Sequence, residues 1–413
     1  MRRRIFLCSL LLAATVCTHV AAADKLSSTA AVEALVHFLD QPADQRGKLA
    51  EQAFATAALS KADAATAKSM LWEDHVARIK ATRKAEMDAR RIKQGDLEMP
   101  FYYRVVGDMP KTGRSLYISL HGGGGAPKQV NDQQYENQKG LYQPAEGVYL
   151  VPRAPTNTWN LWHQGHIDGM FDRLIENLVV FEDVNPNRVY LLGYSAGGDG
   201  VYQLGPRMAD RWAAASMMAG HPNDSSPLSL RNTAFSIQVG GQDTAYNRNK
   251  VAAQWGERLK ELREADPQGY PHMVKIYADK GHWMDREDRI ALPWMAKYTR
   301  NPNPTPLVWH QDDVTHTRFF WLAVEGESRK GRSEIRAGYD GQTVTVQKSS
   351  VPGILIRLND QMLNLDKPIK VVHGETTLFK GRVQRTIKML ATTMAERGDL
   401  SGVYSVEVTV KIE

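Results

Sequence analysis

Cysteine is scarce in this chain, and its position excludes two kinds of chemistry. The only two cysteines among 413 residues are Cys8 and Cys17. Both fall in residues 1–23, where a basic start, a short apolar core and three alanines form the pattern of a secretion signal. We expect this segment to be removed. The mature chain then has no cysteine, which excludes disulfides and a thiol nucleophile.

Long apolar runs and a strong excess of charge are also missing. The apolar core of the signal, Ile5–Val16, is too short to span a bilayer, and no later segment is long enough. Neither cysteine follows the pattern of a lipoprotein site, so we expect a periplasmic or secreted protein without a stable membrane anchor. Removing residues 1–23 lowers the net charge from +6 to +3, and no nucleic-acid motif is present, so we expect no nucleic-acid partner.

Composition divides the rest of the chain into four parts. Residues 24–97 contain almost no glycine and show helical spacing, which predicts two or three helices. Residues 98–300 alternate short strands with amphipathic helices, which indicates a mainly parallel sheet flanked by helices. Residues 301–306 form a stiff proline-rich linker, and residues 307–413 predict a β-rich, sandwich-like domain with one helix.

The first strands of the middle part have a turn-rich connection. Phe101–Val106 and Ser115–Leu120 are separated by a segment that contains two glycines and a proline. This spacing suggests an antiparallel pair at the edge of the sheet.

The segment Gly193–Gly198 is the most informative feature of the sequence. It reads Gly-Tyr-Ser-Ala-Gly-Gly, follows an apolar strand and precedes a helical segment. Strand, Gly-x-Ser-x-Gly and helix form a nucleophile elbow, in which glycines allow a turn sharp enough to expose the hydroxyl of Ser195. The pentapeptide alone fits an ordinary turn equally well. Its neighbours along the chain decide between the two interpretations.

A glycine-rich loop, His121–Gly125, follows an earlier apolar strand. Acyl transfer places negative charge on a carbonyl oxygen, and backbone N–H groups of such a loop can approach that oxyanion closely. The candidate donors are Gly123, Gly124 and, after the serine, Ala196. A flexible loop is one alternative. A phosphate-binding loop is another, although the Gly-Lys-Ser/Thr ending is missing.

An acid and a histidine follow the serine, each just after a predicted strand. Asp243 lies where a carboxylate that orients a histidine belongs, although it could instead cap the next helix. His282 lies on a loop beyond the last strand of the middle part, from which it can reach Ser195. His121 and His221 are the competing histidines, and His121 is placed to support the glycine loop.

These motifs together resemble the α/β-hydrolase superfamily, and in particular exported bacterial carboxylesterases of the polyhydroxybutyrate-depolymerase and feruloyl-esterase-like kind. The resemblance covers about residues 100–300. It is carried by His121–Gly125, Asp168–Ile175, Asn185–Tyr190 leading into Gly193–Gly198, Asp243 and His282. It implies an α/β-hydrolase fold and hydrolysis of carboxylic esters by Ser195, Asp243 and His282, with no metal or organic cofactor.

Two other functions stay open on the sequence. A serine peptidase of the prolyl-oligopeptidase type uses a similar elbow, but there is no room for its propeller. A non-catalytic binding protein on the same fold is the other alternative, although it has no reason to keep all three residues.

The substrate side is predicted from a tryptophan-containing loop. Trp159 and Trp162 follow a strand of the sheet and are candidates for an acyl or aromatic pocket, together with His121. Packing of the loop on the surface is the alternative for both tryptophans. The expected substrate is a small-molecule or polymeric ester.

The C-terminal domain carries aromatic residues that could serve recognition, among them Trp309, Trp321 and Tyr339. We predict that this domain packs beside the middle part as a docking or substrate-presenting module. A chain ending near Pro302 would then fold and keep activity on small esters.

Overall fold

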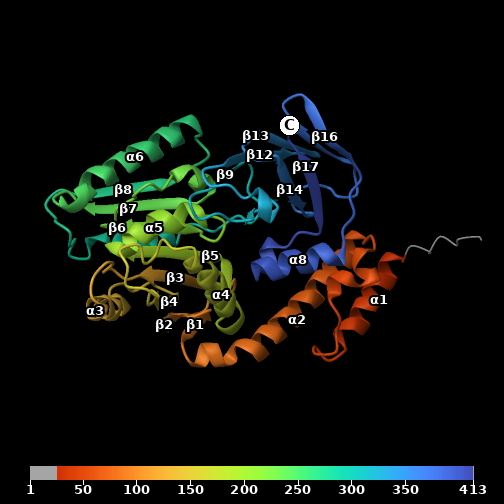
Figure 1. Cartoon of the computed structure of the whole chain (residues 1–413), viewed down its shortest axis with the longest axis horizontal. Coiled ribbons are helices and arrows are strands. Elements are labelled where there is room, and N and C mark those ends of the chain that lie inside the picture. The colour runs from red at the N-terminus through yellow and green to blue at the C-terminus, as the bar shows by residue number, and fades with distance from the viewer. Residues whose placement is uncertain (1–25, 413) are drawn as a thin grey trace, which may run out of the picture.

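The computed structural model describes residues 26–412 and shows three parts (Figure 1). These are a large α/β part, a smaller β-rich part, and N-terminal helices that run between them. The predicted signal, residues 1–23, lies outside the described residues. Within the described residues, no helix combines the length and the apolar character needed to cross a membrane.

The α/β part is built on an eight-stranded sheet with the order β1-β2-β4-β3-β5-β6-β7-β8. Strands β4, β3, β5, β6, β7 and β8 pair in parallel, whereas β2 pairs antiparallel with both β1 and β4. The bounds are β1 (Arg91–Gln94), β2 (Leu97–Val106), β3 (Arg114–Leu120), β4 (Gly147–Pro152), β5 (Val184–Tyr194), β6 (Ala214–Met218), β7 (Ala234–Gly240) and β8 (His272–Tyr277). The predicted, mainly parallel sheet is confirmed.

The predicted antiparallel pairing of Phe101–Val106 with Ser115–Leu120 is wrong. These segments fall in β2 and β3, and β4 lies between the two strands. Every residue of β3 after Arg114 is buried, and such a strand is stable only inside a sheet with a partner on each side. β3 therefore lies between β4 and β5.

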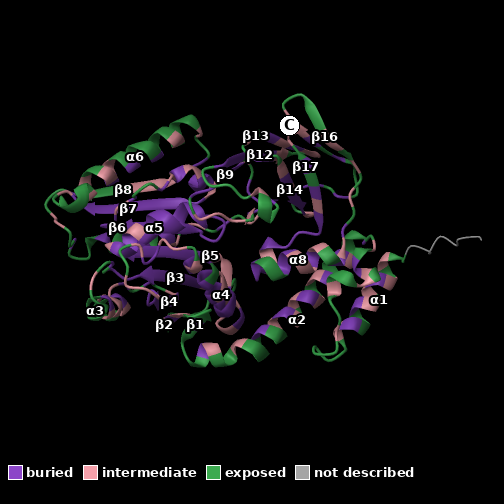
Figure 2. Cartoon of the chain, in the orientation of Figure 1, coloured by how far each residue is buried: buried purple, intermediate pink, exposed green. Residues whose placement is uncertain are grey.

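Helices cover both faces of the sheet (Figures 1 and 2). Apolar side chains of α4, α5 and α6 form one core with alternate strand residues, and those of α3 and α7 form a second core on the other face. Leu191 points into the first core, while its neighbours Tyr190 and Leu192 point into the second. The bounds are α3 (Lys128–Lys139), α4 (His166–Phe181), α5 (Ala196–Arg207), α6 (Arg248–Ala265) and α7 (Ala291–Met295).

The C-terminal part consists of two sheets and one helix, as the sequence indicates. One sheet has the order β16-β15-β13-β12-β9 and the other β10-β11-β14-β17. The bounds are β9 (Leu307–His310), β10 (Arg318–Phe319), β11 (Leu322–Ala323), β12 (Glu334–Asp340), β13 (Thr343–Ser349), β14 (Gly353–Leu358), β15 (Ile369–His373), β16 (Thr376–Gly381), α8 (Ile387–Arg397) and β17 (Val406–Lys411). The buried apolar side chains of these strands are continuous with the core of α4, α5 and α6.

The N-terminal helices are α1 (Ser28–Leu39) and the long α2 (Lys61–Asp88). The first half of α2 packs with α1 and α8 in a separate apolar cluster. Its second half contacts α4, where His75 Nε2 lies 2.7 Å from Oε1 of Glu176. β1 follows at the edge of the main sheet, so the segment expected to be helical ends in a strand. Helix α2 thus connects the two larger parts (Figure 1).

The aromatic residues proposed for docking are largely used inside the protein. Trp309 and Trp321 are buried, and Tyr339 is half-buried. The indole N–H of Trp321 donates to the carbonyl of Pro304 at 2.7 Å, so the proline-rich segment 301–306 is packed against the C-terminal part. Docking through this part stays a prediction, and the two tryptophans cannot supply its surface.

Buried charges join the C-terminal part to the α/β part. Asp210 lies just after α5, and its Oδ2 accepts a hydrogen bond from Arg397 at the end of α8. Nη1 of Arg318 in β10 lies 3.7 Å from the same oxygen. Burial opposes ionisation of Asp210, but Arg397, Arg318 and Arg211 hold its pKa well below the ordinary value. A second buried pair, Arg300 with Asp399, lies close by. The shared core and these ion pairs argue against a C-terminal part that detaches without cost.

We predict that Asp210→Ala strongly destabilises the protein. The substitution removes the carboxylate that Arg397 bonds and leaves Arg318 with Asp172 alone, and breaking a buried ion pair typically costs about 3–5 kcal/mol. Urea denaturation measures the change in the free energy of unfolding. Asp108→Ala is the matched control, because Asp108 is exposed and has no side-chain partner within residues 26–412; its change should stay within about 0.5 kcal/mol. A change of similar size in both variants would contradict the role of Asp210.

Candidate active site

The turn between β5 and α5 holds Ser195 in a conformation that side-chain-bearing residues rarely adopt. Its φ is 58° and its ψ is −122°. The turn is tight because two backbones cross here. A Cβ on Gly193 would collide with the carbonyl of Gly197, and a Cβ on Gly197 would collide with the carbonyl of Leu120. Glycine is therefore required at both positions, and the hydroxyl of Ser195 stands at the end of the sheet.

The three residues predicted as a catalytic triad lie together. Nε2 of His282 is 3.0 Å from Oγ of Ser195, and Nδ1 of His282 is 2.7 Å from Oδ2 of Asp243. Asp243 is buried, whereas the His282 side chain is 43% exposed. A carboxylate beside Nδ1 keeps the proton on that nitrogen, so that Nε2 can accept the serine proton.

Another acid near the end of the α/β part, Asp288, and the competing histidine His221 make other bonds. Asp288 is buried and accepts a hydrogen bond from Tyr142. His221 lies near the serine, but its Nδ1 accepts a hydrogen bond from the N–H of Asn223 at 2.9 Å. Neither residue takes part in the chain of bonds that reaches Ser195.

The glycine loop lies beside the serine and is fixed by a residue that the sequence analysis missed. Asn131, the buried first-turn residue of α3, accepts the N–H of Gly124 at 3.0 Å and donates to the carbonyls of Gly124 and Ala126, each at 3.0 Å. Gly123 has a φ of 112°, and a Cβ there would collide with Oδ1 of Asn131. A buried asparagine seven residues after Gly124 carried no recognisable sequence pattern.

These bonds distinguish the three predicted oxyanion donors. The N–H of Gly124 is already donated to Asn131, which corrects its assignment as a donor to a ligand. No acceptor within residues 26–412 takes the N–H of Gly123. Ala196 is the first residue of α5, so its N–H has no partner within the helix. Gly123 and Ala196 are the two donors available beside Ser195.

Burial also corrects the assignment of His121 and Trp162 to substrate binding. Both side chains are completely buried. Nε2 of His121 accepts the N–H of Ala154 at 3.1 Å, and the indole N–H of Trp162 donates to the carbonyl of His121 at 3.0 Å. Burial lowers the pKa of His121 to about 3, so the ring is neutral. The two buried side chains therefore support the backbone of the glycine loop.

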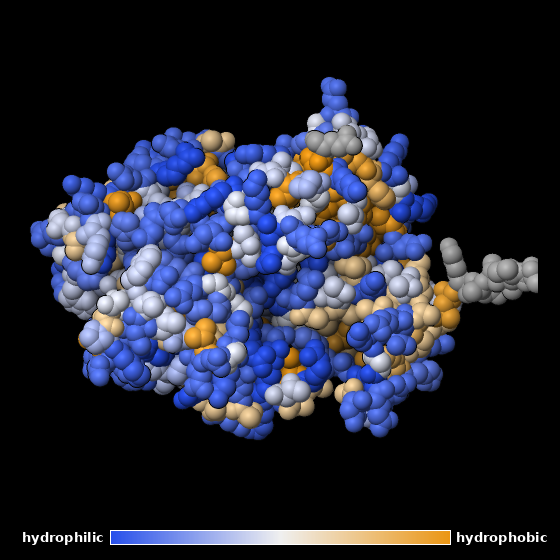
Figure 3. Space-filling model, in the orientation of Figure 1, coloured by the Kyte–Doolittle hydropathy of each residue, from blue (hydrophilic) through white to orange (hydrophobic). Residues whose placement is uncertain are grey.

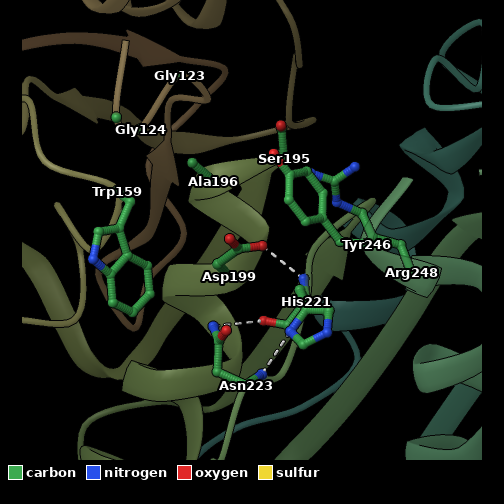
Figure 4. A pocket seen from close by; sticks show the side chains of 11 residues that line it. Gly123, Gly124, Trp159, Ser195, Ala196, Asp199, His221, Asn223, Tyr246 and Arg248 are labelled. Atoms are coloured by element: carbon green, nitrogen blue, oxygen red, sulfur yellow. Dashed lines mark hydrogen bonds between the residues drawn. The ribbon is translucent and has the colours of Figure 1, made fainter. Parts of the chain in front are cut away.

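A pocket opens next to Ser195 (Figure 4). Its volume is about 230 Å³. It is lined by Gly123, Gly124, Gly125, Trp159, Ser195, Ala196, Asp199, His221, Asn223, Tyr246 and Arg248. Trp159, 63% exposed, lies across the pocket from Tyr246, 75% exposed, and polar side chains lie between the two rings. Of the three residues predicted for substrate binding, only Trp159 lines this pocket.

Asp199 is a lining residue of the pocket that the sequence analysis missed. It follows Ser195 by one helical turn and accepts the N–H of His221 at 2.6 Å. Burial raises the pKa of Asp199 to about 6, although the N–H of His221 and the charges of Arg248 and His282 act in the opposite direction. Four-residue spacing from the elbow serine was the available signal, since it places both side chains on one side of α5.

The strand order and the positions of the three residues have one common interpretation. β2 is antiparallel in an otherwise parallel sheet, β4 precedes β3 in space, and the serine, acid and histidine follow β5, β7 and β8. This is the α/β-hydrolase fold. Within the described residues, no cluster of three His, Cys, Asp or Glu side chains is arranged to hold a metal ion.

Comparison of the sequence with models of known families and with curated proteins finds no match. Solved structures show remote likenesses. A thermostable esterase is 18% identical over 51% of this chain and 62% of its own, with a TM-score of 0.40. A ferulic acid esterase is 16% identical over 48% of this chain and 98% of its own, with a TM-score of 0.33. An acylaminoacyl peptidase from Pyrococcus horikoshii is 12% identical over 51% of this chain and 41% of its own, with a TM-score of 0.37. This chain thus spans less than two thirds of the thermostable esterase.

We predict that the Asp199→Asn variant gains stability relative to the original protein as the pH rises. A carboxyl whose pKa is raised from 3.8 to about 6 by folding favours the folded state at low pH, and this advantage is lost between about pH 4 and pH 6. Asparagine keeps the acceptor for His221 but does not ionise. The variant should therefore gain up to about 3 kcal/mol relative to the original protein between pH 4 and pH 7. Urea denaturation at both pH values measures this difference, and a constant difference would contradict the raised pKa.

We also predict that Asn131→Ala impairs the glycine loop without displacing the triad. Removing the side chain leaves the buried N–H of Gly124 unsatisfied, which typically costs about 1–3 kcal/mol. Gly123 should then be held less firmly, so reaction of Ser195 with a fluorophosphonate should slow by about tenfold or more. The exposed Asn137 on the same helix provides the control variant, Asn137→Ala, which should react at the original rate.

Proposed function

We propose that this protein is a serine hydrolase that cleaves carboxylic esters through an acyl-enzyme. The observation that carries the proposal is the continuous chain of short contacts from Asp243 to His282 to Ser195, which ends at a strained elbow beside unused N–H donors. Resemblance of the motifs to exported carboxylesterases supports the choice of ester over amide.

In this mechanism, Oγ of Ser195 attacks the ester carbonyl as Nε2 of His282 takes its proton. The carbonyl oxygen becomes an oxyanion, which accepts hydrogen bonds from the N–H groups of Gly123 and Ala196. His282 then gives the proton to the departing alkoxide, and the acyl group stays on Ser195. Water, deprotonated by His282, attacks the acyl carbon, releases the acid and restores the serine.

Asp243 has a positioning and electrostatic role in both steps. Its buried carboxylate lies against Nδ1 of His282 and stabilises the imidazolium that forms when the serine proton moves. The exposed edge of His282 leaves room for an alcohol to depart and for water to enter.

The N-terminal pattern of residues 1–23 supports export as a part of this proposal. The site would then act on esters outside the cytoplasm. Mass spectrometry of the protein purified from a secreting host should find a chain that begins near Asp24.

We predict that Ser195→Ala abolishes turnover while the protein stays folded. Hydrolysis of a short p-nitrophenyl ester should fall by about 10⁴-fold or more, because the covalent step is lost. Labelling by a fluorophosphonate should disappear as well. Ser69→Ala is the matched control, since Ser69 is exposed on α2, far from the elbow.

Two outcomes would contradict the proposal. Near-normal turnover by Ser195→Ala would remove Ser195 as the nucleophile. Absence of labelling on the original, folded protein would favour a binding protein on a hydrolase fold. Parallel assays with aminoacyl amides test the peptidase alternative, which predicts substantial turnover of the amide, whereas an esterase cleaves only the matched ester.

A further inference from the structure

Arg248 is a charged residue of the pocket without a matching partner. It is the first residue of α6 and lines the pocket beside Ser195. Its side chain is only 12% exposed, and its Nε is buried without a hydrogen-bond partner within residues 26–412. Within the part of the chain that the structure describes, its one side-chain hydrogen bond joins Nη1 to Oδ1 of Asp243 at 3.5 Å, the outer limit for such a bond. A guanidinium has five N–H donors, and burial makes unused donors costly.

The carboxylate of Asp243 neutralises the charge of Arg248 only in part, because the same carboxylate also accepts a hydrogen bond from His282. Its Oδ2 lies 2.7 Å from Nδ1 of His282, and only the other oxygen faces Arg248. Asp199 shares the pocket, but no carboxylate oxygen of Asp199 lies within 4 Å of Arg248. Donors of Arg248 are therefore left for a ligand.

The backbone before Arg248 is strained in a way that shapes this part of the pocket. Tyr246 and Asn247 have φ values of 54° and 55°, although neither is glycine. Two successive left-handed residues are unfavourable, and such strain is concentrated at functional sites. Tyr246, a residue 75% exposed, lies at the pocket, and the guanidinium carbon of Arg248 lies 4.9 Å from the centroid of its ring. Figure 4 shows both side chains on the same side of the pocket.

The lining residues indicate which half of an ester this pocket holds. The pocket includes Ser195 and both available oxyanion donors, Gly123 and Ala196, but not His282. The leaving alcohol must lie beside His282, because His282 protonates it. The acyl part therefore extends into the pocket, toward Arg248.

We propose that Arg248 binds a carboxylate on the acyl part of the substrate, so that the preferred substrates are monoesters of dicarboxylic acids. This inference rests on the proposed ester hydrolysis. A carboxylate accepts two N–H groups of a guanidinium side by side. A single arginine matches one negative charge, whereas a phosphate dianion would leave an excess charge near Asp199. Tyr246 covers the guanidinium and limits its access to water.

The test compares two esters that differ only in this charge. Mono-p-nitrophenyl adipate carries the carboxylate, and p-nitrophenyl methyl adipate has it blocked. The original protein should have the higher kcat/KM for the anionic ester. Arg248→Gln should lower the ratio of the two values by about tenfold or more, mainly through a higher KM for the anionic ester. The ratio cancels any damage to Asp243, which would slow both esters equally.

Two further variants sharpen the result. Arg248→Lys keeps the charge but loses the paired donors, so it should restore part of the ratio. Arg258→Gln removes an arginine from the same helix, where Arg258 pairs with Glu261 on the surface at 2.8 Å, and it should leave the ratio unchanged. An unchanged ratio in Arg248→Gln, or faster turnover of the neutral ester by the original protein, would overturn the inference.

Binding separates this inference from the proposed function. Calorimetry with Ser195→Ala should show that monomethyl adipate binds more tightly than dimethyl adipate, and that Arg248→Gln in the same background removes the difference. If the original protein hydrolyses neither p-nitrophenyl ester, the proposed function fails, and calorimetry still decides whether Arg248 selects a carboxylate. Equal binding of the two adipates would exclude that role.

Discussion

The close crossing of two backbones at the end of β5 is the constraint on which the site depends. Gly193 and Gly197 lack the Cβ atoms that would separate the serine turn from the end of β3. The crossing gives Ser195 its positive φ and places the glycine loop beside it. The same contact fixes the start of α5, and hence the N–H of Ala196 and the carboxylate of Asp199. One steric requirement thus positions Ser195, the N–H of Ala196 and part of the pocket together.

The C-terminal part contacts the far end of the helix α5, which begins at the serine turn. Its apolar core is continuous with the side chains of α4 and α5, and its residues Arg397 and Arg318 lie against Asp210, just beyond α5. Buried ion pairs need not increase stability over an apolar core, but removing one partner is costly. A part of the chain that carries no triad residue is therefore tied to the helix that begins at the elbow. This explains why its aromatic residues serve packing and are not displayed for recognition.

Charge in the pocket is arranged asymmetrically around the serine. Asp243 is divided between His282 and Arg248, burial raises the pKa of Asp199, and burial lowers the pKa of His221. An arginine in this setting has a stronger effect than on the surface, since little water screens it. Of the residues predicted to line an acyl or aromatic pocket, only Trp159 does so, and polar side chains make up much of the remaining lining.

The sequence by itself determined the mainly parallel sheet, the elbow and the grouping of Ser195, Asp243 and His282. These features depend on local signals: strands that end in glycines, followed by a serine, an acid and a histidine in order. It also indicated the β-rich C-terminal part from alternating side chains. It could not determine strand order, so β4 was not expected between β2 and β3. The sequence also could not distinguish buried side chains from exposed ones. Packing of the folded chain buries His121, Trp162, Trp309 and Trp321, whereas Trp159 stays exposed. Neighbours distant in sequence determine the roles of Asn131, Asp199 and Arg248. Only the tertiary structure decided which N–H groups and charges were left without a partner among the described residues, because packing sets the partners of a side chain.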